Sequence, residues 1–202
     1  MSFPFGRKIQ VRKPEETDLE KIASWLHDPS FIKHLYGSPL HSLAEFTQKA
    51  RHLLSQNAKD TSPDFTLIME SKTGQPIGLM MFRNINWKDR NTEINLAIGE
   101  QSFRNSYYGV EAFVLTLLVG FHELNLHKIY GYIYHTNSSS EHIVKQVGNY
   151  EGTLRDHYYR DGEFVDVNVY SCFSSQLKDS LLRLKDGVLK KSFDQGYFSE
   201  YT

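Results

Sequence analysis

Residues 99–112 place a short loop between a predicted strand and the start of the longest apolar helix in the sequence. The first amide groups of a helix have no partner inside the helix, and the helix dipole adds partial positive charge there. Such a loop binds a phosphate or another anion through its backbone. Glycine suits this position because the backbone must approach the anion closely, and Gly109 supplies one glycine at the helix start. The loop therefore predicts a phosphate site.

Hydrophobic periodicity defines the elements on both sides of this loop. The strand at 93–99 alternates, with Ile94, Leu96 and Ile98 on one face and Glu93, Asn95 and Ala97 on the other. After the loop, apolar residues recur at helical spacing and predict an apolar stripe, made of Val110, Phe113, Val114, Leu117, Leu118 and Phe121.

The remaining elements predict a mixed α/β fold with one central sheet. Helices are expected to begin after Thr17 or Asp18 and to span 42–57 and 138–146. Strands are expected within 7–13 and over 65–69, 76–82, 128–134, 154–160 and 164–173, with a two-residue turn at Asp161-Gly162. The order requires helices on both faces of the sheet and a parallel crossover around the long helix.

Composition excludes several classes of protein. The 202 residues carry 23 Lys and Arg against 24 Asp and Glu, a net charge of -1, which argues against nucleic acid or an anionic membrane as partner. The single cysteine, Cys172, forms no internal disulfide, and the 9 histidines show no paired ligand spacing, so no metal site is expected. The sequence shows no targeting segment and no apolar run of membrane-spanning length, so a cytoplasmic protein is expected.

Two segments divide the chain. Residues 1–174 are expected to form one domain, and residues 175–202 an amphipathic C-terminal helix and tail. In the segment Gln176–Leu189, four apolar residues recur at helical spacing: Leu177, Leu181, Leu184 and Val188. This helix either packs on its own domain or forms a dimer or partner contact.

Residues 77–173 resemble the GNAT superfamily of acyl-CoA-dependent N-acyltransferases, especially the branch of ribosomal-protein and spermidine acetyltransferases. The order of the elements matches that fold. The residues that carry the resemblance are Ile77-Gly78, Asn86-Trp87-Lys88, Arg90 to Ile94, Ile98-Gly99-Glu100, Tyr108 to Ala112, Phe121, Leu124 to Ile129, Asn137 and Glu151 to Arg155.

Two positions depart from the family pattern. Arg104 and Gly109 match the pyrophosphate loop, but Asn105, Ser106 and Tyr107 replace its Gly-Lys-Gly part. The segment 148–152 is one residue short and lacks the Phe that ends the preceding helix in the family. Either change would weaken cofactor binding or mark a protein that has lost catalysis.

The resemblance implies acetyl-CoA as the acyl donor. Its pyrophosphate is expected on the backbone amides of Arg104, Asn105, Ser106, Tyr107, Tyr108 and Gly109. Its pantetheine arm is expected between 93–99 and 128–134, which splay apart in this family, beside Asn95, Leu96 and Ile98. The thioester carbonyl would accept an N–H near Asn95 or Leu96. Asn137 would hold the pantetheine or position Ser140.

The implied reaction needs a group that accepts a proton, because an amine with a pKa of ~10 is almost wholly protonated at neutral pH. Glu93 is the first candidate, since it occupies the acidic position of the family strand. The alternative is a structural ion pair of Glu93 with Arg83 or Arg90. His135, at the end of the next strand, is the second candidate base.

The departing thiolate needs a proton donor. Many members of the family use a Tyr at the position of Val144, and Ser140 matches the serine of the ribosomal-protein branch. Helix capping is the alternative role for residues 137–140, whose hydroxyls would cap the helix equally well. The acceptor site is expected to use aromatic and polar residues of the early helices and late loops, Trp25, Tyr36, Trp87 and His157.

Three functions from different classes fit these observations. The first is an N-acetyltransferase that acts on a primary amine of a small molecule, amino sugar or peptide N-terminus, as a monomer or homodimer. The second is a catalytically silent protein of the same fold that binds an acyl carrier or a protein partner. The third is a structural or assembly protein that uses the helix at 176–189.

Overall fold

The computed structural model describes residues 3–32, 35, 43–56, 62–104, 106–160, 162–185, 187 and 189–201. One seven-stranded sheet has the strand order β1-β2-β3-β4-β5-β7-β6. The strands are β1 (Ile9–Arg12), β2 (Phe65–Ser71), β3 (Pro76–Asn86), β4 (Asn91–Ile98), β5 (Lys128–Tyr134), β6 (Asn149–Arg160) and β7 (Glu163–Phe173). All neighbours are antiparallel except β4 and β5, which are parallel, so the predicted crossover around the long helix is confirmed.

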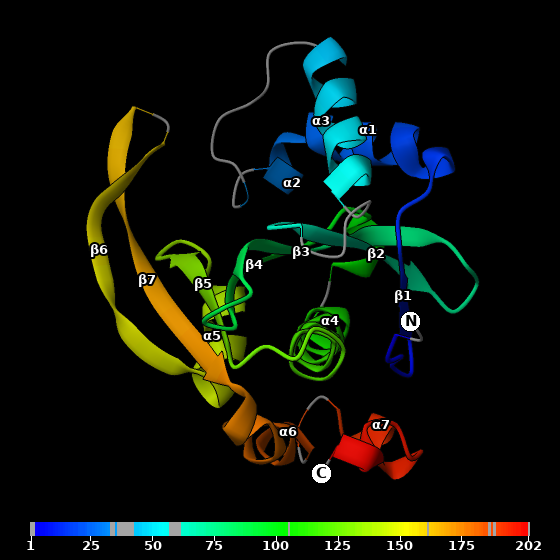
Figure 1. The fold of residues 1–202 in the computed structure, drawn as a ribbon, viewed down its shortest axis with the longest axis vertical. Coiled ribbons are helices and arrows are strands. Elements are labelled where there is room, and N and C mark those ends of the chain that lie inside the picture. Colours follow the sequence, from blue (N-terminus) through cyan, green and yellow to red (C-terminus); the bar gives the residue numbers. More distant parts are fainter. Residues whose placement is uncertain are drawn as a thin grey trace.

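Helices cover both faces of this sheet. In Figure 1, α1, α2 and α3 lie on one side, and α4, α6 and α7 lie on the other. The α-helices are α1 (Leu19–His27), α2 (Pro29–Ile32), α3 (Leu43–Gln56), α4 (Ser106–Leu118), α5 (Ser138–Val147), α6 (Leu177–Lys185) and α7 (Lys190–Asp194). Shorter helical turns are η1 (Glu16–Asp18), η2 (Gln101–Phe103), η3 (Val119–Glu123), η4 (Ser174–Gln176) and η5 (Ser199–Tyr201), of which η3 is a π-helical extension of α4.

The predicted elements are confirmed in type and order. The sequence analysis missed α2 and α7. The single helix predicted over 176–189 is wrong in length, because α6 ends at Lys185 and α7 begins at Lys190. Asp161 lies outside the described residues, but Arg160 pairs with Glu163 and Gly162 has φ +92°, which agrees with the predicted two-residue hairpin turn.

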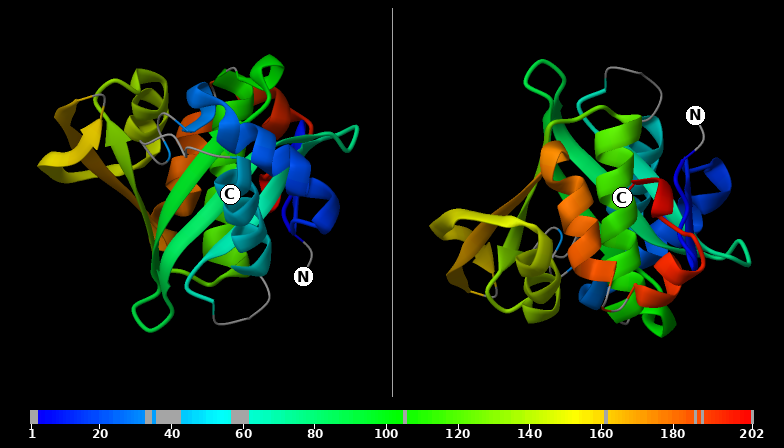
Figure 2. Two further views of the ribbon diagram at one scale, coloured as in Figure 1. Left: turned by 90° about the horizontal axis from the view of Figure 1, so that it is seen from above. Right: turned by 90° about the horizontal axis from the view of Figure 1, so that it is seen from below.

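Helix α4 is buried on all sides instead of along one stripe. Every residue from Val110 to Phe121 is buried. The sheet covers one side of the helix, and Figure 2 (right) shows α6 and the C-terminal segment beside it on the other. Apolar residues of the tail belong to the same main core as α4: Leu177, Leu181, Leu184, Leu189, Phe193 and Phe198. The described part of 175–202 therefore packs on its own domain, while the division at residue 174 stays a prediction.

A second core lies on the opposite face of the sheet. Alternation along β2 and β3 sends Ile68, Leu79 and Met81 toward α1 and α3, while Leu67, Met80 and Phe82 enter the main core. Each of these central strands is therefore buried on both faces, which explains their nearly continuous apolar sequences.

Asp18 does not cap α1 with its side chain, contrary to the prediction. Its buried carboxylate instead accepts hydrogen bonds from Arg12 at 2.6 and 2.8 Å, and Arg12 also binds Glu70 at 2.6 Å. Burial alone would raise the pKa of Asp18, but hydrogen bonds from Arg12 and from the Glu15 amide, with the charge of Arg12, hold it below its usual value. The three side chains join the start of α1 to the β1–β2 edge.

Asp18→Asn is expected to lower the free energy of unfolding at pH 7 by about 2 to 3 kcal/mol, because it breaks a charge-assisted, partly buried pair. Because the folded pKa lies below the ordinary aspartate value of 3.8, this stabilisation is complete above that pH and is lost as the pH falls through the folded pKa. Urea unfolding across pH measures the effect, with the exposed Glu16→Gln as control. A constant difference between parent and variant down to acid pH would contradict it.

Candidate active site

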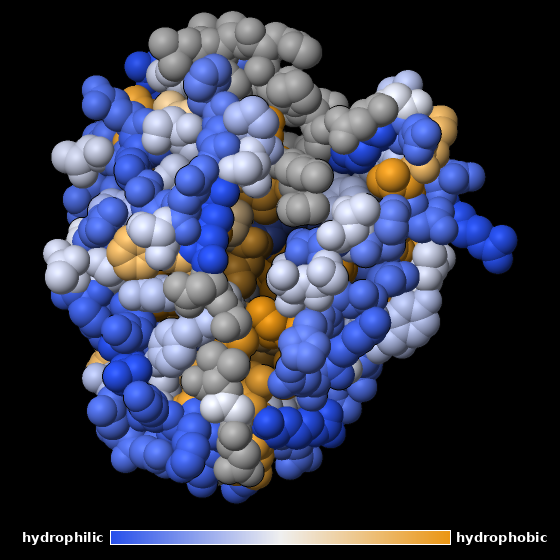
Figure 3. Space-filling model, turned by 180° about the vertical axis from the view of Figure 1, so that it is seen from behind, coloured by the Kyte–Doolittle hydropathy of each residue, from blue (hydrophilic) through white to orange (hydrophobic). Residues whose placement is uncertain are grey.

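Strands β4 and β5 part in the middle of the sheet. They pair only at Asn91–Lys128, Thr92–Ile129 and Glu93–Tyr130, although β4 continues to Ile98 and β5 to Tyr134. A cleft of about 1110 Å³ opens at this splay and continues between α4 and α5. Figure 3 shows the hollow from behind, with apolar residues in its floor. The splay that the family resemblance implied is confirmed.

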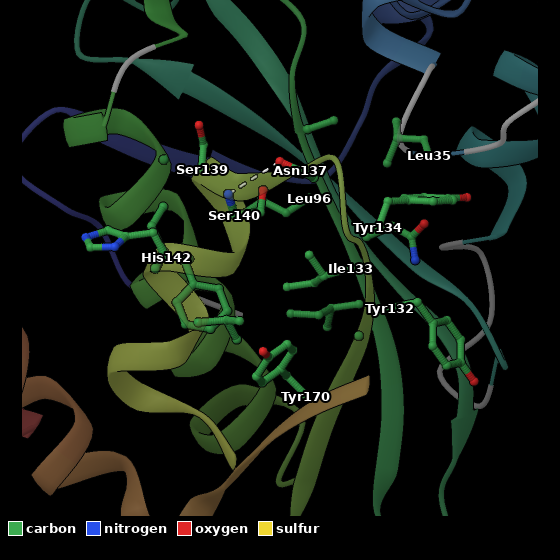
Figure 4. A pocket seen from close by; sticks show the side chains of 18 of the residues that line it. Leu35, Leu96, Tyr132, Ile133, Tyr134, Asn137, Ser139, Ser140, His142 and Tyr170 are labelled. Carbon is green, nitrogen blue, oxygen red and sulfur yellow. Dashed lines mark hydrogen bonds between the residues drawn. The ribbon is translucent and has the colours of Figure 1, made fainter. Parts of the chain in front are cut away.

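The two splayed strands give the cleft an apolar and a polar side. Cross-strand pairs share a face of the sheet, and Ile94, Leu96 and Ile98 pack toward the main core, whereas Ala97 packs toward the second core. On β5, Figure 4 shows Ile133 directed toward α5, while Tyr132 and Tyr134 point to the opposite side. On the α4–α5 side the two strands therefore present apolar side chains, and on the side toward α1 and α2 they present polar and aromatic groups.

Tyrosines dominate the polar side. Tyr130, Tyr132 and Tyr134 of β5 line the cleft together with Tyr158 of β6. The rings of Tyr132 and Tyr158 lie 6.5 Å apart, and those of Tyr134 and Tyr158 lie 5.6 Å apart. Burial raises the pKa of Tyr130, Tyr132 and Tyr158, and the negative charge of Glu93 raises each of them further, after a contribution of Tyr132 in the case of Tyr130. Glu93 pairs with Tyr130 across β4 and β5, at the edge of this cluster.

An irregularity in β6 positions Tyr158. The β6–β7 register shifts between Leu154 and Tyr158, where Asp156 has φ +47° and its amide donates to Asp166 at 2.8 Å. A bulge of this kind bends a strand and redirects its side chains. Tyr158 is thereby paired with Val165, on the face of the sheet that the β5 tyrosines occupy.

Glu93 lies at the last paired position before the splay. Its carboxylate accepts a hydrogen bond from the side-chain amide of Asn95 at 2.9 Å, and both residues line the cleft. The two arginines considered as its partners have other contacts. The Arg83 guanidinium lies 3.6 Å from the Asp64 carboxylate, and Arg90 Nε donates a hydrogen bond to the Asn125 carbonyl at 2.8 Å. Among the described residues, the ion pairs within 4.0 Å do not include Glu93, so the structural alternative for this residue finds no support.

Arg104 is engaged within the protein. Its Nε donates to the Ile98 carbonyl and one terminal nitrogen to the Gly99 carbonyl, both at 2.8 Å, and it also binds Ser30 at 2.7 Å and Asp28 at 3.1 Å. Its backbone amide donates to the Gln101 carbonyl at 3.0 Å. The expectation that the Arg104 amide binds pyrophosphate is therefore corrected: Arg104 joins the end of β4 to the start of α2.

The side chains of Tyr107 and Tyr108 point away from the cleft lining. The Tyr107 hydroxyl lies 2.7 Å from the Ser192 hydroxyl, and the ring packs against the main core. Tyr108 packs edge-on against Phe103, with centroids 5.0 Å apart. Asn105 lies outside the described residues, as does the side chain of Ser106. Within the first turn of α4, Gly109 lines the cleft.

Asn137 and Ser140 lie at the start of α5 and both line the cleft. The Asn137 side chain accepts a hydrogen bond from the Ser140 backbone amide at 3.4 Å, so Asn137 caps α5, as the capping alternative for residues 137–140 expects (Figure 4). The proton-donor role of Ser140 stays a prediction. His135 is exposed in the turn after β5 and is not among the cleft-lining residues.

The predicted acceptor residues are not brought together. Trp25 is 3% exposed, donates to Glu100 at 2.8 Å and packs so closely on Gly99 that a Cβ there would lie 2.4 Å from its ring. Trp87 lies in the β3–β4 turn and donates to the Ser62 carbonyl at 3.1 Å. His157 is exposed beside the tyrosines, and its ring centroid lies 5.7 Å from that of Tyr132. Tyr36 lies outside the described residues.

Sequence reasoning missed the tyrosines of β5. Their signal was present, because residues 128–134 alternate Tyr130, Tyr132 and Tyr134 with Ile129, Gly131 and Ile133. That alternation gives a strand one aromatic and one small or aliphatic face. The strand was predicted, but its faces were not assigned to the cleft.

Comparison with known proteins agrees with this geometry. The model of the acetyltransferase (GNAT) domain matches residues 8–149. Spermidine N(1)-acetyltransferase of Escherichia coli (strain K12) is 23% identical over 175 residues, which cover 86% of this chain and 90% of that protein. An uncharacterized N-acetyltransferase of Bacillus subtilis, YoaA, is 31% identical over 100 residues, 49% of this chain and 56% of that protein.

Solved structures show the same fold. Spermidine N-acetyltransferase from Vibrio cholerae in complex with CoA and spermine superposes with a TM-score of 0.75 at 22% identity, covering 84% of this chain and 97% of that one. The same enzyme in complex with manganese ions gives a TM-score of 0.69 at 22% identity, over 85% and 96% of the two chains. The expected absence of a metal therefore stays a prediction for this chain.

The chain belongs to the GNAT acetyltransferase family. It is an acyl-CoA-dependent N-acetyltransferase that transfers an acetyl group to a primary amine. No helix within the described residues is long and apolar enough to cross a membrane.

Proposed function

We propose that this acetyltransferase binds acetyl-CoA in the cleft between α4 and α5 and acetylates a cationic aliphatic amine of the polyamine class on the tyrosine side. The observation that carries this proposal is the splay of β4 and β5 beside one carboxylate and several tyrosine rings. The cleft reaches both sides of the sheet there, so donor and acceptor approach the same point from opposite faces.

The donor site is proposed on the first turn of α4. Amides at the start of a helix lack partners within it and attract anions. Because the Arg104 amide is engaged, the diphosphate is placed on the amides of Ser106–Gly109. The pantetheine arm would lie along the β5-facing edge of β4, from Ile98 toward Asn95, and Asn137 would contact it from the start of α5. Tyr107, the main reason for considering a silent protein, packs away from this path.

The acceptor ammonium is proposed against Glu93, Tyr130 and Tyr132. A carboxylate attracts the cation, and tyrosine faces add a cation–π contribution. The Arg160 guanidinium carbon already lies 4.6 Å from the ring centroid of Tyr158 and 5.6 Å from that of Tyr134. The amine is therefore assigned to the other two tyrosines of the cluster, Tyr130 and Tyr132. The relatives named for spermidine acetylation favour the same class of acceptor.

Acid–base chemistry is assigned to two residues. Glu93, directly or through water, takes the proton that the amine loses as its nitrogen attacks the thioester carbon. The carbon–sulfur bond then breaks, and the Ser140 hydroxyl supplies a proton to the departing CoA thiolate. The Asn137 cap holds Ser140 at the start of α5 for this step.

Ser140→Ala is expected to lower kcat by about 100-fold with little change in the affinity for acetyl-CoA, because it removes only the proton donor. Initial rates of thiol release and calorimetric titration measure the two quantities. Ser139→Ala is the matched control, since Figure 4 shows its hydroxyl directed away from Ser140. Equal rates for Ser140→Ala and the parent would remove Ser140 from the mechanism.

A panel of amines tests the acceptor class. Thiol release from acetyl-CoA is followed with spermidine, spermine, an amino sugar and a peptide with a free N-terminus. The proposal expects the polyamines to give the highest kcat/KM. Preference for the amino sugar or peptide would overturn the polyamine assignment, and no release with any amine would favour the catalytically silent alternative.

A further inference from the structure

The cleft ends in an apolar region that is almost closed to solvent. Ile129 of β5, Val144 of α5, Cys172 of β7 and Leu184 of α6 line it, and we call these four residues the deep end. None of the four is more than 7% exposed. The cleft therefore extends into the main core on the α4–α5 side.

The deep end presents carbon atoms and a neutral thiol. Burial raises the pKa of Cys172 to about 12, so its thiol is uncharged at neutral pH. Tyr170 borders this region, but its hydroxyl donates a hydrogen bond to the Glu141 carboxylate at 3.0 Å. Apolar cavities in proteins stay dry and take apolar ligands. A polar acceptor amine is therefore a poor occupant of this region.

A glycine lies at the entrance to the deep end. Gly131 directly follows Tyr130, the last residue of β5 that pairs with β4. On its other side β5 pairs with β7, where Gly131 lies opposite Tyr170 and Ile129 lies opposite Cys172. A Cβ on Gly131 would lie 3.5 Å from the Ile94 carbonyl oxygen and 3.7 Å from Ile94 Cγ1. Any larger side chain would thus narrow the passage from β4 to the deep end.

We propose that the deep end is an acyl pocket, which allows transfer of propionyl and butyryl groups in addition to acetyl. The inference rests on the proposed function, because that function runs the pantetheine arm along β4 from Ile98 toward Asn95, which brings the thioester close to Ile94 and Gly131. A longer alkyl chain would pass Gly131 and pack on the deep end. The reaction is unchanged: the amine nitrogen bonds to the acyl carbon and loses a proton, while CoA leaves as a thiolate and gains one.

Calorimetry with CoA and its unreactive S-ethyl, S-propyl and S-butyl thioethers tests the pocket without turnover. Each added methylene is expected to raise the affinity about threefold to fourfold. Binding of CoA with no gain along the series would overturn the acyl pocket and leave the proposed function intact. Failure of CoA itself to bind would overturn both.

Substitutions at Cys172 test the location of the pocket. Cys172→Phe fills the deep end and should lower the ratio of kcat/KM for butyryl-CoA to kcat/KM for acetyl-CoA by about tenfold. This factor corresponds to losing the burial of the two methylenes by which butyryl exceeds acetyl. Cys172→Ala removes the thiol without filling the space and should keep the ratio at least as high as in the parent. If Cys172→Phe does not fold, Gly131→Val narrows the entrance instead. If whichever of these two variants folds keeps the parent ratio of butyryl to acetyl kcat/KM, the proposal is overturned.

Discussion

Gly109→Glu is expected to weaken acetyl-CoA binding by at least about 1000-fold. The new side chain would place a carboxylate in the first turn of α4, at a position that lines the cleft. Two like charges 4 Å apart repel by about 4 kcal/mol at the effective dielectric of a protein surface, and the diphosphate carries more than one charge. Calorimetric titration measures the loss, and thermal unfolding shows whether the variant is folded.

Gly109→Ala separates charge from bulk. Among the residues that the structure describes, its Cβ would meet only Ile143 Cδ1, at 3.6 Å, which is an ordinary van der Waals contact. This variant should therefore bind acetyl-CoA within a few-fold of the parent. Parent-like affinity in Gly109→Glu would show that the diphosphate lies elsewhere.

Glu93→Gln is expected to lower kcat by about 100-fold to 1000-fold and to leave acetyl-CoA affinity nearly unchanged. The amide keeps the size of the side chain but cannot accept the proton that the amine must lose. It also removes the charge beside Tyr130 and Tyr132, so KM for the amine should rise. Rates of thiol release at varied amine concentration separate the two effects.

Glu20→Gln, on the exposed face of α1, is the control for loss of one negative charge. It should leave both kcat and KM near the parent values. A kcat of Glu93→Gln equal to that of the parent would exclude Glu93 as base. A rise in KM alone would limit Glu93 to binding the amine.

Local patterns predicted most of the fold because most of its strands show clear alternation or a continuous apolar run. The alternation of Ile94, Leu96 and Ile98 with Glu93, Asn95 and Ala97 correctly assigned the two faces of β4. The loop between this strand and α4 followed from the change of period at the helix start. Resemblance to a family supplied the splay, which periodicity alone does not show.

Contacts between distant residues account for what could not be predicted. Arg104 binds Ser30 across 74 positions of sequence, and Tyr107 meets Ser192 across 85. The backbone amides of both residues were assigned to the cofactor, because nothing local shows that their side chains have these partners. Trp25 was assigned to the acceptor for the same reason, although Glu100 and Gly99 hold it in the second core.

The burial of α4 shows the same limit. Its apolar residues were predicted as one stripe, but the C-terminal segment covers the side that the sheet leaves open. A helix that is apolar all round indicates burial on all sides. The apolar residues between the predicted stripe positions, such as Ala112 and Leu115, were the available signal.

A crystal structure of the complex with acetyl-CoA tests the central claim most directly. The diphosphate oxygens should lie within hydrogen-bond distance of the amides of Ser106–Gly109, with pantetheine between β4 and β5 and the thioester beside Leu96. A diphosphate bound away from α4, or an acetyl group outside the splay of β4 and β5, would contradict the account.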